Sequence, residues 1–544
     1  MLTEEQIEKI IERLINRIEE ANVEYLKAIG DSIKQIRNIS PTEAHQLVQI
    51  LKYGGSYKDI RKKLAKYTKL NIKDIDAIFE EYAKVDLNFY EQFYKYRNIP
   101  FIEYEYKESY KRQTEALANM VKNEMYNFTR SNVLGYTING KFMSLRDTYN
   151  MALDNALLNV GQGKETFDSA MRSILKEIGG SGLKTIEYES GRSIRLDSAV
   201  RMHLKGRLRE LHNENQKIIG EELGTDGIEI SVHGNPAPDH EMVQGRQFTN
   251  EEYEKLNNGL IANDYKGNTY TLDHDGKNGY RPISEMNCYH VVFTVILGIN
   301  KPLYEDEELQ EIIANNEKGF TYEGKHYTNY EGTQLQRMLE RKIREQKDIQ
   351  ILARESGNKV LAGESQNKIR VLTDKYKDLT EASGLPSKMK RMTVSNYQRK
   401  AEFTKAYESE IAKYKVGEFD VTKYTKEMKP TTNQVVFMEN RKTPNSEKHP
   451  KDVKYYDKIP NILQKPDQVY IERNGRANTM WLIKEIDGKK VETIVKINTT
   501  TLYQEKQLGY KNSIIHLHTT REKYLKNKVD RGELELLFDI NNQK

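Results

Sequence analysis

The chain has 544 residues, 31% of them charged, and a mean hydropathy of −0.80. This length exceeds what one hydrophobic core can organise, so we expect several domains. No stretch is long and apolar enough to cross a membrane, and the acidic start "MLTEEQIEKIIERL" predicts a helix rather than a signal peptide. A single cysteine excludes an intramolecular disulfide and fits synthesis in a reducing cytosol.

The net charge of +5 is unevenly distributed along the chain. From Arg441 to Lys544, 21 Lys and Arg face 14 Asp and Glu, an excess of seven positive charges. A basic C-terminal domain favours a polyanion as partner, most simply nucleic acid. The alternative is a basic surface that only aids solubility.

Amphipathic spacing predicts consecutive helices in a helical N-terminal region, residues 1–178. Ser40, Pro41 and Glu43 form a helix-start pattern, with a capping residue, a first-turn proline and a glutamate at the third helical position. The Tyr-rich stretch "NFYEQFYKYRNIPFIEYEYKESY" favours packing or an assembly surface over a cofactor site.

Residues 179–320 change pattern and predict a compact α+β core. A glycine-rich break precedes a long helix that begins near Leu196, and "GTDGIEISVHG" alternates as a strand does. A short helix is expected at "TNEEYEKLN" and a buried strand at "CYHVVFTVIL".

The rest of the chain divides into three predicted parts. Residues 321–406 read as a helical hairpin with a basic end, and residues 407–450 as a polar linker with at most short structure. Residues 451–544 alternate with a period of two, which predicts a small antiparallel β domain; its "DGKK" suits a type I′ hairpin turn. The expected fold class is therefore multidomain α+β.

The segment "HGNPAPDHEMVQGRQF" and the later "NCYHVVF" gather scarce histidines with the only cysteine. His233, His240, Cys288 and His290 are ligand types that suit zinc, although their spacing matches no tight finger pattern. Asp239 is a further ligand or a partner that orients an imidazole. The alternative is a hydrogen-bonded knot around a small buried thiol. A nucleophilic Cys288 activated by His290 is the least favoured interpretation.

Three stretches, "YESGRSIRLDSAVR", "ISVHGNPAPDHEMVQGRQFTNEEYEKLN" and "MNCYHVVFTVILGINKP", closely resemble the phage minor capsid protein 2 family. Its members are similar to the head morphogenesis proteins typified by that of phage Mu. The similarity extends over residues 1 to about 400. Two positions depart from the family pattern, since Val243 stands where a Trp is typical and "NCYH" replaces "NCRH". The resemblance implies a structural virion protein associated with the portal or inner capsid during head formation.

The C-terminal β pattern carries side chains suited to RNA cleavage: His449, Arg473, Arg476, Lys496, Thr500, Ser513, His516 and His518. Cleavage without a metal needs a base for the 2′-hydroxyl, an acid for the leaving oxygen and cations for the phosphorane charge. His516 and His518 lie two apart on a predicted strand and therefore share a face. The alternative is an exposed β face with incidental histidines.

Residues 440–540 also resemble the phage-encoded branch of the barnase, EndoU, colicin and RelE-like nucleases, through the run "LQKPDQVY", "MWLIKEI", "IVKINTT" and "NSIIHLHT". The resemblance implies that some of these side chains are catalytic and that others bind nucleic acid. The catalytic candidates are His449, Lys496, Thr500, Ser513 and His516, and the binding candidates are Arg473, Arg476 and His518.

The expected protein is a minor capsid component of a tailed bacteriophage, made in the host cytoplasm and located in the virion. Its expected partners are portal and capsid proteins and, through the C-terminal domain, host RNA or packaged DNA. That domain is expected to be a metal-independent endoribonuclease delivered to the host. Two alternatives remain open: a toxin whose helical body serves delivery, and a head protein whose last domain binds nucleic acid without cleaving it.

Overall fold

The structure is a computed structural model with two compact units of mixed α+β character. It describes residues 4–53, 55–129, 133–186, 193–272, 281–283, 288, 290–428, 430–474, 476, 478–497 and 512–542. The first unit comprises Met1–Met338, Thr380–Ser387 and Val394–Asn396. The second comprises Leu339–Leu379, Lys388–Thr393 and Tyr397–Lys544. The predicted hairpin 321–406 is thus divided between the units.

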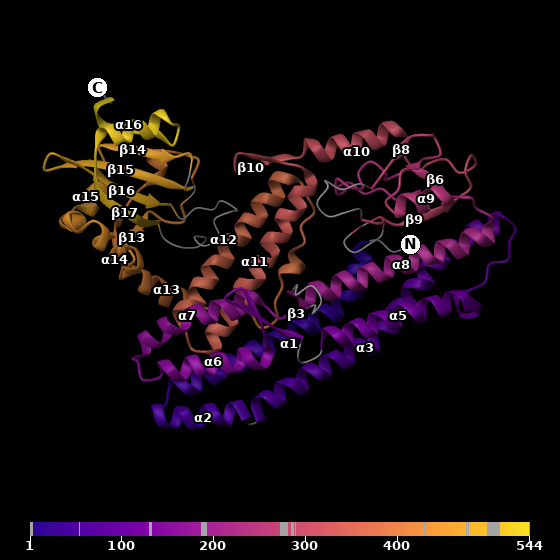
Figure 1. Cartoon of the computed structure of the whole chain (residues 1–544), viewed down its shortest axis with the longest axis horizontal. Helices are drawn as coiled ribbons and strands as arrows, with labels where there is room; N and C mark the ends of the chain where they lie inside the picture. The colour runs from indigo at the N-terminus through magenta and orange to yellow at the C-terminus, as the bar shows by residue number, and fades with distance from the viewer. Residues whose placement is uncertain are drawn as a thin grey trace. The chain divides into compact units, whose positions relative to one another are not determined.

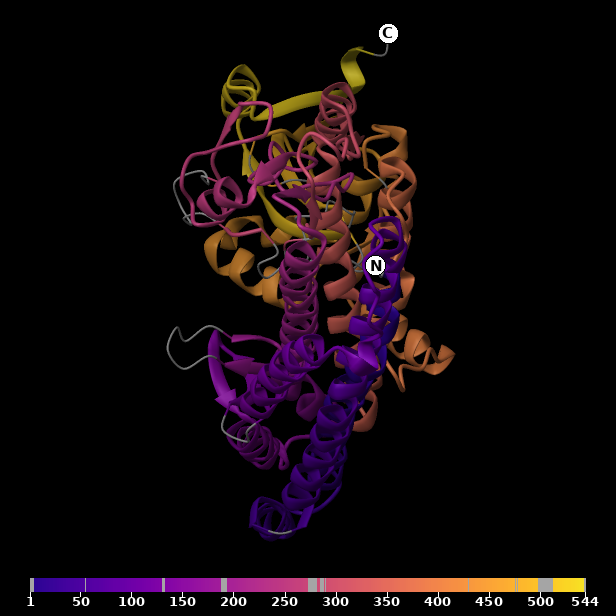
Figure 2. The same ribbon diagram turned by 90° about the vertical axis from the view of Figure 1, so that its right-hand side faces the viewer.

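Long amphipathic helices dominate the first unit, and α1, α3, α5 and α8 pack against one another (Figures 1 and 2). The helices are α1 (Glu4–Arg37), α2 (Pro41–Tyr53), α3 (Gly55–Phe89), α4 (Glu91–Tyr96), α5 (Glu108–Phe128), α6 (Leu145–Asn159), α7 (Lys164–Ser181), α8 (Leu196–Leu223), α9 (Asn250–Asn257) and α10 (Asp306–Lys318), with a 3-10 turn η1 (Tyr104–Tyr106). Among the described residues, no helix is apolar over enough of its length to span a bilayer.

The predicted start of α2 is confirmed. The Glu43 amide donates to Ser40 Oγ at 3.4 Å, and the Ser40 amide donates to Glu43 Oε2 at 3.0 Å. This reciprocal pair satisfies amides that the first helical turn leaves without an intrahelical partner.

Short strands interrupt the helices of the first unit. They are β1 (Leu134–Ile138), β2 (Lys141–Ser144), β3 (Lys184–Ile186), β4 (Ser193–Arg195), β5 (Gly227–Ile230), β6 (Gln247–Thr249), β7 (Ala262–Asn263), β8 (Thr269–Tyr270), β9 (Val292–Val295), β10 (Phe320–Tyr322) and β11 (Lys325–Tyr327). The sheet ordered β2-β1-β3-β4 differs from the all-helical expectation for residues 1–178. Strands of three to five residues give too few alternations for a period-two pattern to stand out.

The sheet ordered β6-β5-β9 carries the loop that holds the histidines. Both predicted strands are confirmed as β5 and β9, which pair antiparallel from Gly227 with Val295 to Ile230 with Val292. The predicted short helix is α9, and the Glu252 amide donates to its capping residue Thr249 at 3.1 Å. Helix α8 packs against β9.

Helices α11 (Asn329–Glu355) and α12 (Lys359–Ser383) form the predicted antiparallel pair. Gln336 Nε2 donates to Thr380 Oγ1 at 3.3 Å, and four residues further along α11 Glu340 Oε1 accepts from Tyr376 at 3.3 Å. The basic stretch after α12 contains one 3-10 turn, η2 (Met389–Met392).

The second unit ends in a seven-stranded sheet ordered β12-β13-β17-β16-β15-β14-β18. Its elements are α13 (Ala401–Ala412), β12 (Lys415–Glu418), η3 (Val421–Lys423), β13 (Gln434–Val436), α14 (Glu439–Lys448), η4 (Pro450–Lys458), α15 (Ile459–Gln464), β14 (Gln468–Glu472), β15 (Thr479–Ile486), β16 (Lys489–Lys496), β17 (Asn512–Thr520), α16 (Glu522–Asp530), β18 (Leu534–Asp539) and η6 (Ile540–Asn542). All pairings are antiparallel except that of β13 with β17.

Residues 407–450 are not the linker that their polar composition suggests. They supply β12 and β13 to the sheet and Phe419, Val421 and Phe437 to its core. These three apolar residues are buried but stand among many polar neighbours in sequence, so the stretch resembles a loop in composition although it packs into the core.

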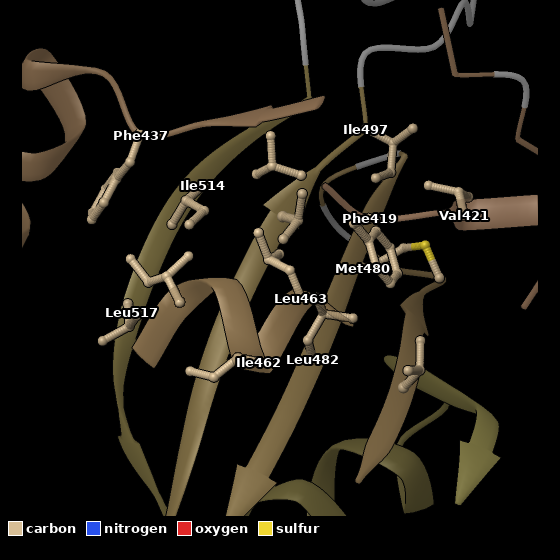
Figure 3. Packing of buried hydrophobic residues seen from close by; sticks show 14 of the residues in the cluster. Phe419, Val421, Phe437, Ile462, Leu463, Met480, Leu482, Ile497, Ile514 and Leu517 are labelled. Carbon is tan, nitrogen blue, oxygen red and sulfur yellow. The ribbon is translucent and has the colours of Figure 1, made fainter. Parts of the chain in front are cut away.

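Each face of this sheet is covered differently. Helix α15 lies against one face, where Ile462 and Leu463 meet side chains such as Leu482 and Leu517 (Figure 3). The opposite face holds a smaller cluster of Tyr470, Trp481, Ile483, Ile494, Leu525 and Leu534, in which Leu525 belongs to α16. The predicted type I′ turn joins β15 and β16, with positive φ at both Asp487 (52°) and Gly488 (69°).

Candidate functional sites

The first cluster of histidines is buried in the loops that flank β5 and β9. His240, Cys288 and His290 are each at most 1% exposed, and their possible ligand atoms lie within 4.8 Å of one another. Cys288 Sγ is 3.3 Å from His240 Nδ1 and 3.5 Å from His290 Nδ1. The ring of His233 lies 4.5 Å from that of His290, centroid to centroid. Three of the four residues proposed as metal ligands therefore converge, and the ring of the fourth, His233, lies against that of His290.

Neighbouring groups fix the tautomers of two of these histidines. His240 Nε2 is 2.8 Å from the Arg281 carbonyl, which can only accept, so Nε2 carries the proton. His290 Nε2 lies 3.2 Å from Gln244 Oε1, an oxygen that also accepts from the His233 amide at 3.1 Å. Burial and the nearby His233 and His240 hold the pKa of His290 well below its usual value. The Nδ1 atoms of both rings therefore face the same sulfur.

One thiol proton can serve only one of these two acceptors. A metal-bound thiolate would serve both, because a cation takes an electron pair from each nitrogen and from sulfur. The donor set thus fits zinc, with two imidazoles and one thiolate in place.

Asp239 does not point at the sulfur. Its carboxylate accepts two hydrogen bonds from Arg281, each of 2.9 Å, and lies 3.4 Å from His240 Nε2. These contacts are compatible with the orienting role, one of the two expected of it, and Arg281 and Gln244 are partners that spacing did not identify.

The second cluster lies in the C-terminal sheet domain. His516 and His518 come from β17 and His449 from the junction of α14 and η4. The ring centroids are 4.8 Å apart for His449 and His516, 4.7 Å for His449 and His518, and 4.6 Å for the strand pair. The expectation that the two strand histidines share a face agrees with this geometry.

Asn445 holds His449 against the edge of β17. Its amide Nδ2 donates to the Leu517 carbonyl at 2.9 Å, and its Oδ1 accepts from the Leu517 amide at 3.1 Å. Asp452 similarly accepts from the Thr519 amide at 3.0 Å. Asn445 and Asp452 thus bond backbone groups of β17 that a neighbouring strand would otherwise bond. Asp452 lies 67 positions before Thr519, and the two contacts hold His449 beside the histidine pair.

Polar groups beside this cluster are buried without partners. Glu492, fully buried and directly opposite His518 across β16 and β17, has an Oε1 3.6 Å from His518 Nε2. Within the described ranges, neither carboxylate oxygen of Glu492 has a hydrogen-bond partner, and neither have His449 Nε2 and His518 Nδ1. Burial raises the pKa of Glu492 to about 7. Burial, with the neighbouring histidines, lowers the pKa of both His516 and His518 to about 4.

Basic side chains lie on the same face of the sheet. Lys496 ends β16 directly opposite Ser513, and side chains alternate along β16 so that Lys496, Ile494 and Glu492 share the face of the histidines. Burial, then the charges of Arg441 and Arg476, lower the pKa of Lys496. The charge of Arg476 also contributes to lowering the pKa of His516.

Two candidates stand apart from this group. Arg473 is paired with Glu427 and Glu535, both at 2.6 Å, so two carboxylates already offset the charge proposed for nucleic acid. Thr500 lies outside the described residues. Sequence reasoning missed Glu492, Asn445 and Asp452, because nothing in their local pattern marks them as neighbours of His449 or β17.

Comparison with known proteins gives one match. The family model of phage minor capsid protein 2 matches residues 2–381, which include the buried cluster and end before the C-terminal sheet. Neither the curated proteins nor the solved structures include a match to the chain.

Proposed function

Because the chain belongs to the phage minor capsid protein 2 family, we propose that it is a head component bound to the portal or inner capsid and that its C-terminal sheet domain cleaves RNA. The family match covers most of the chain and makes it a structural protein of a phage head. The attachment point within the head and the RNA chemistry are proposals that rest on the surfaces and side chains below.

Exposed aromatic side chains support a protein partner for the helical region. Tyr96 is 87% exposed and Tyr106 is 75% exposed, and Phe89, Phe93 and Ile102 beside them are also exposed. The other tyrosines of this stretch, Tyr90, Tyr94, Tyr104 and Tyr110, are buried. Aromatic residues are enriched at protein interfaces because they bury much area with few rotatable bonds.

Replacing Tyr96 and Tyr106 together by serine tests this surface. We expect fewer copies per purified head with an unchanged melting temperature, because both rings are exposed. Tyr265→Ser, a change at another exposed tyrosine (52%), is the matched control. Normal incorporation of the double variant would exclude this surface.

The observation that carries the RNA proposal is the shared face of β16 and β17, with Lys496, Ser513, His516 and His518 on two paired strands. His516 takes the proton of a ribose 2′-hydroxyl, and the 2′-oxygen bonds to phosphorus as the bond to the 5′-oxygen breaks. His449 acts as the acid that gives a proton to that leaving oxygen. Lys496 and Arg476 stabilise the negative charge of the phosphorane.

Incubation of the full chain with transfer and ribosomal RNA, with and without EDTA, tests the proposal. We expect cleavage that resists EDTA and falls about 10²–10³-fold in Lys496→Ala, the range for removing one group that stabilises transition-state charge. Lys489→Ala, at the exposed opposite end of β16, is the matched control. Intact RNA with the wild-type chain would refute the nuclease.

Two other outcomes correspond to the alternatives. Saturable RNA binding without cleavage would make the domain a nucleic-acid clamp. Cleavage by a chain that is absent from purified virions would favour a toxin with a helical delivery body and overturn the structural role of this chain in the head.

We also propose that His240, Cys288 and His290 hold a zinc ion, with His233 next to it. The convergence of two Nδ1 lone pairs on one sulfur supports this assignment. Elemental analysis of the purified chain tests it: we expect bound zinc that Cys288→Ser reduces by one equivalent.

A further inference from the structure

The three histidines of the C-terminal domain form a donor set that the RNA proposal does not fully explain. The possible ligand atoms of His449, His516 and His518 lie within 4.8 Å of one another. Four bonds of about 2.0–2.1 Å around a tetrahedral zinc ion place neighbouring nitrogens roughly 3.3 Å apart.

Two nitrogens of the cluster are buried without partners. His449 Nε2 and His518 Nδ1 have no hydrogen bond within the described part of the chain. Buried polar atoms are almost always paired, so two such atoms from sequence-distant residues at one place indicate a ligand that both nitrogens bind. A cation satisfies them together, since each imidazole donates an electron pair to it.

The surroundings of His518 match those of a metal-bound imidazole. A histidine that binds metal through one ring nitrogen commonly gives the other N–H to a carboxylate, which fixes its orientation. His518 Nε2 lies 3.6 Å from Glu492 Oε1, close enough for an ion pair and slightly beyond hydrogen-bond length, while its Nδ1 has no hydrogen bond among the described residues. Glu492 is fully buried and has no other use in the RNA mechanism.

We propose that His449, His516 and His518 bind one divalent transition-metal ion of the zinc and cobalt class, with Glu492 as a positioning residue for His518. Three imidazoles fill three positions of a tetrahedron and leave the fourth for water or a phosphate oxygen. The site differs from the buried cluster because it contains no sulfur.

The proposal does not rest on RNA cleavage, but the two are linked. His449 and His516 serve as acid and base in the RNA mechanism, and nitrogens that hold a metal cannot transfer protons. A metal-loaded chain should therefore cleave RNA more slowly than a chelated one.

Cobalt titration of the full chain tests the site, because cobalt reports its ligands by absorption. We expect visible d–d bands from one equivalent that persists in Cys288→Ser and gives no thiolate charge-transfer band. His449→Ala and His518→Ala should abolish this equivalent, while His45→Ala, a change at an exposed histidine of α2, should retain it. Circular dichroism confirms that each variant is folded.

Glu492→Gln tests the positioning residue. We expect cobalt to bind about 10–100-fold more weakly with similar d–d bands, the usual cost of losing such a carboxylate. An unchanged affinity would assign Glu492 to packing alone.

The results separate the two proposals. Cobalt absorption that is identical in His449→Ala and wild type, or absent from Cys288→Ser, would overturn the metal site whatever happens to RNA. Cobalt binding without RNA cleavage under any condition would refute the nuclease and leave the metal site standing.

Discussion

The two histidine clusters use similar side chains in opposite ways. In the buried cluster, the outer nitrogens of His240 and His290 are hydrogen-bonded, so both rings are fixed before anything binds. In the C-terminal cluster, His449 and His518 each keep a buried nitrogen without a hydrogen bond in the described structure, and the buried Glu492 lies 3.6 Å from His518 Nε2, beyond hydrogen-bond length. The first arrangement suits a permanent structural clip. The second suits a group that arrives and leaves, whether a metal ion or a phosphodiester.

The largest effect that distinguishes the clusters should come from His516→Ala. We expect RNA cleavage by the full chain to fall about 10²–10⁴-fold, the usual contribution of a general base. His45→Ala, on the exposed surface of α2, should cleave at the wild-type rate. A His516→Ala chain that is folded and fully active would remove the C-terminal cluster from catalysis.

The second-largest effect that distinguishes the two clusters is expected from metal removal. In a His449→Ala background, the buried cluster is the one candidate metal site left among the described residues to respond to EDTA. Zinc at 100–1,000 times its Kd would stabilise the first unit by about 3–4 kcal/mol, which chelation should remove. Calorimetry should show a melting temperature that EDTA lowers. Adding Cys288→Ser to this variant should abolish the effect of EDTA. A melting temperature that EDTA does not change would mean that the cluster is a hydrogen-bonded knot without a metal.

A smaller effect is expected from Asp239→Asn. This change neutralises the carboxylate that accepts two hydrogen bonds from Arg281. The Arg281 carbonyl in turn accepts from His240 Nε2 and orients that ring. Hydrogen bonds to charged groups contribute about 1.5–3 kcal/mol to stability, and we expect a loss in that range. Urea denaturation measures it, with Asp226→Asn as a control outside the cluster. A loss below 0.5 kcal/mol, roughly the scatter of surface changes, would show that the pair does not support the site.

The smallest effect concerns the turn that supports the C-terminal cluster. Gly488 has a φ of 69°, and its surroundings leave space for a methyl group. Gly488→Ala should therefore cost only backbone strain, about 1–2 kcal/mol, with the histidine geometry intact. Denaturation of this variant and its RNA cleavage rate should show lower stability and normal activity. A parallel loss of activity would mean that the turn sets the register of β16 against β17.

Local patterns predicted the elements whose causes are local. Ser40 and Glu43 announce α2, and the Asp487–Gly488 pair announces the β15–β16 hairpin, because each depends on neighbouring residues only. The spacing of His516 and His518 likewise places both rings on one face of a strand.

Features that depend on distant residues could not be predicted. Asn445 binds the backbone of β17 and thereby carries His449 to the strand histidines, but an asparagine in a polar helix has no pattern that reveals this. Glu492 alternates with apolar residues as a solvent-facing residue would, although it is fully buried. The strands at 415–436 were missed because β13 is held in the sheet by β17, about 80 residues away, and β12 in turn pairs with β13.

The pairing of β13 with β17 limits where the chain can be cut if the last domain is to stay folded by itself. A protease that cut near residue 450, after the polar stretch, would release a piece without β12, β13 and the apolar anchors Phe419 and Phe437. It would also separate His449 from His516 and His518. The smallest C-terminal fragment that keeps both this fold and the histidine cluster therefore starts upstream of Lys415. Any cleavage that releases an active fragment has to fall there.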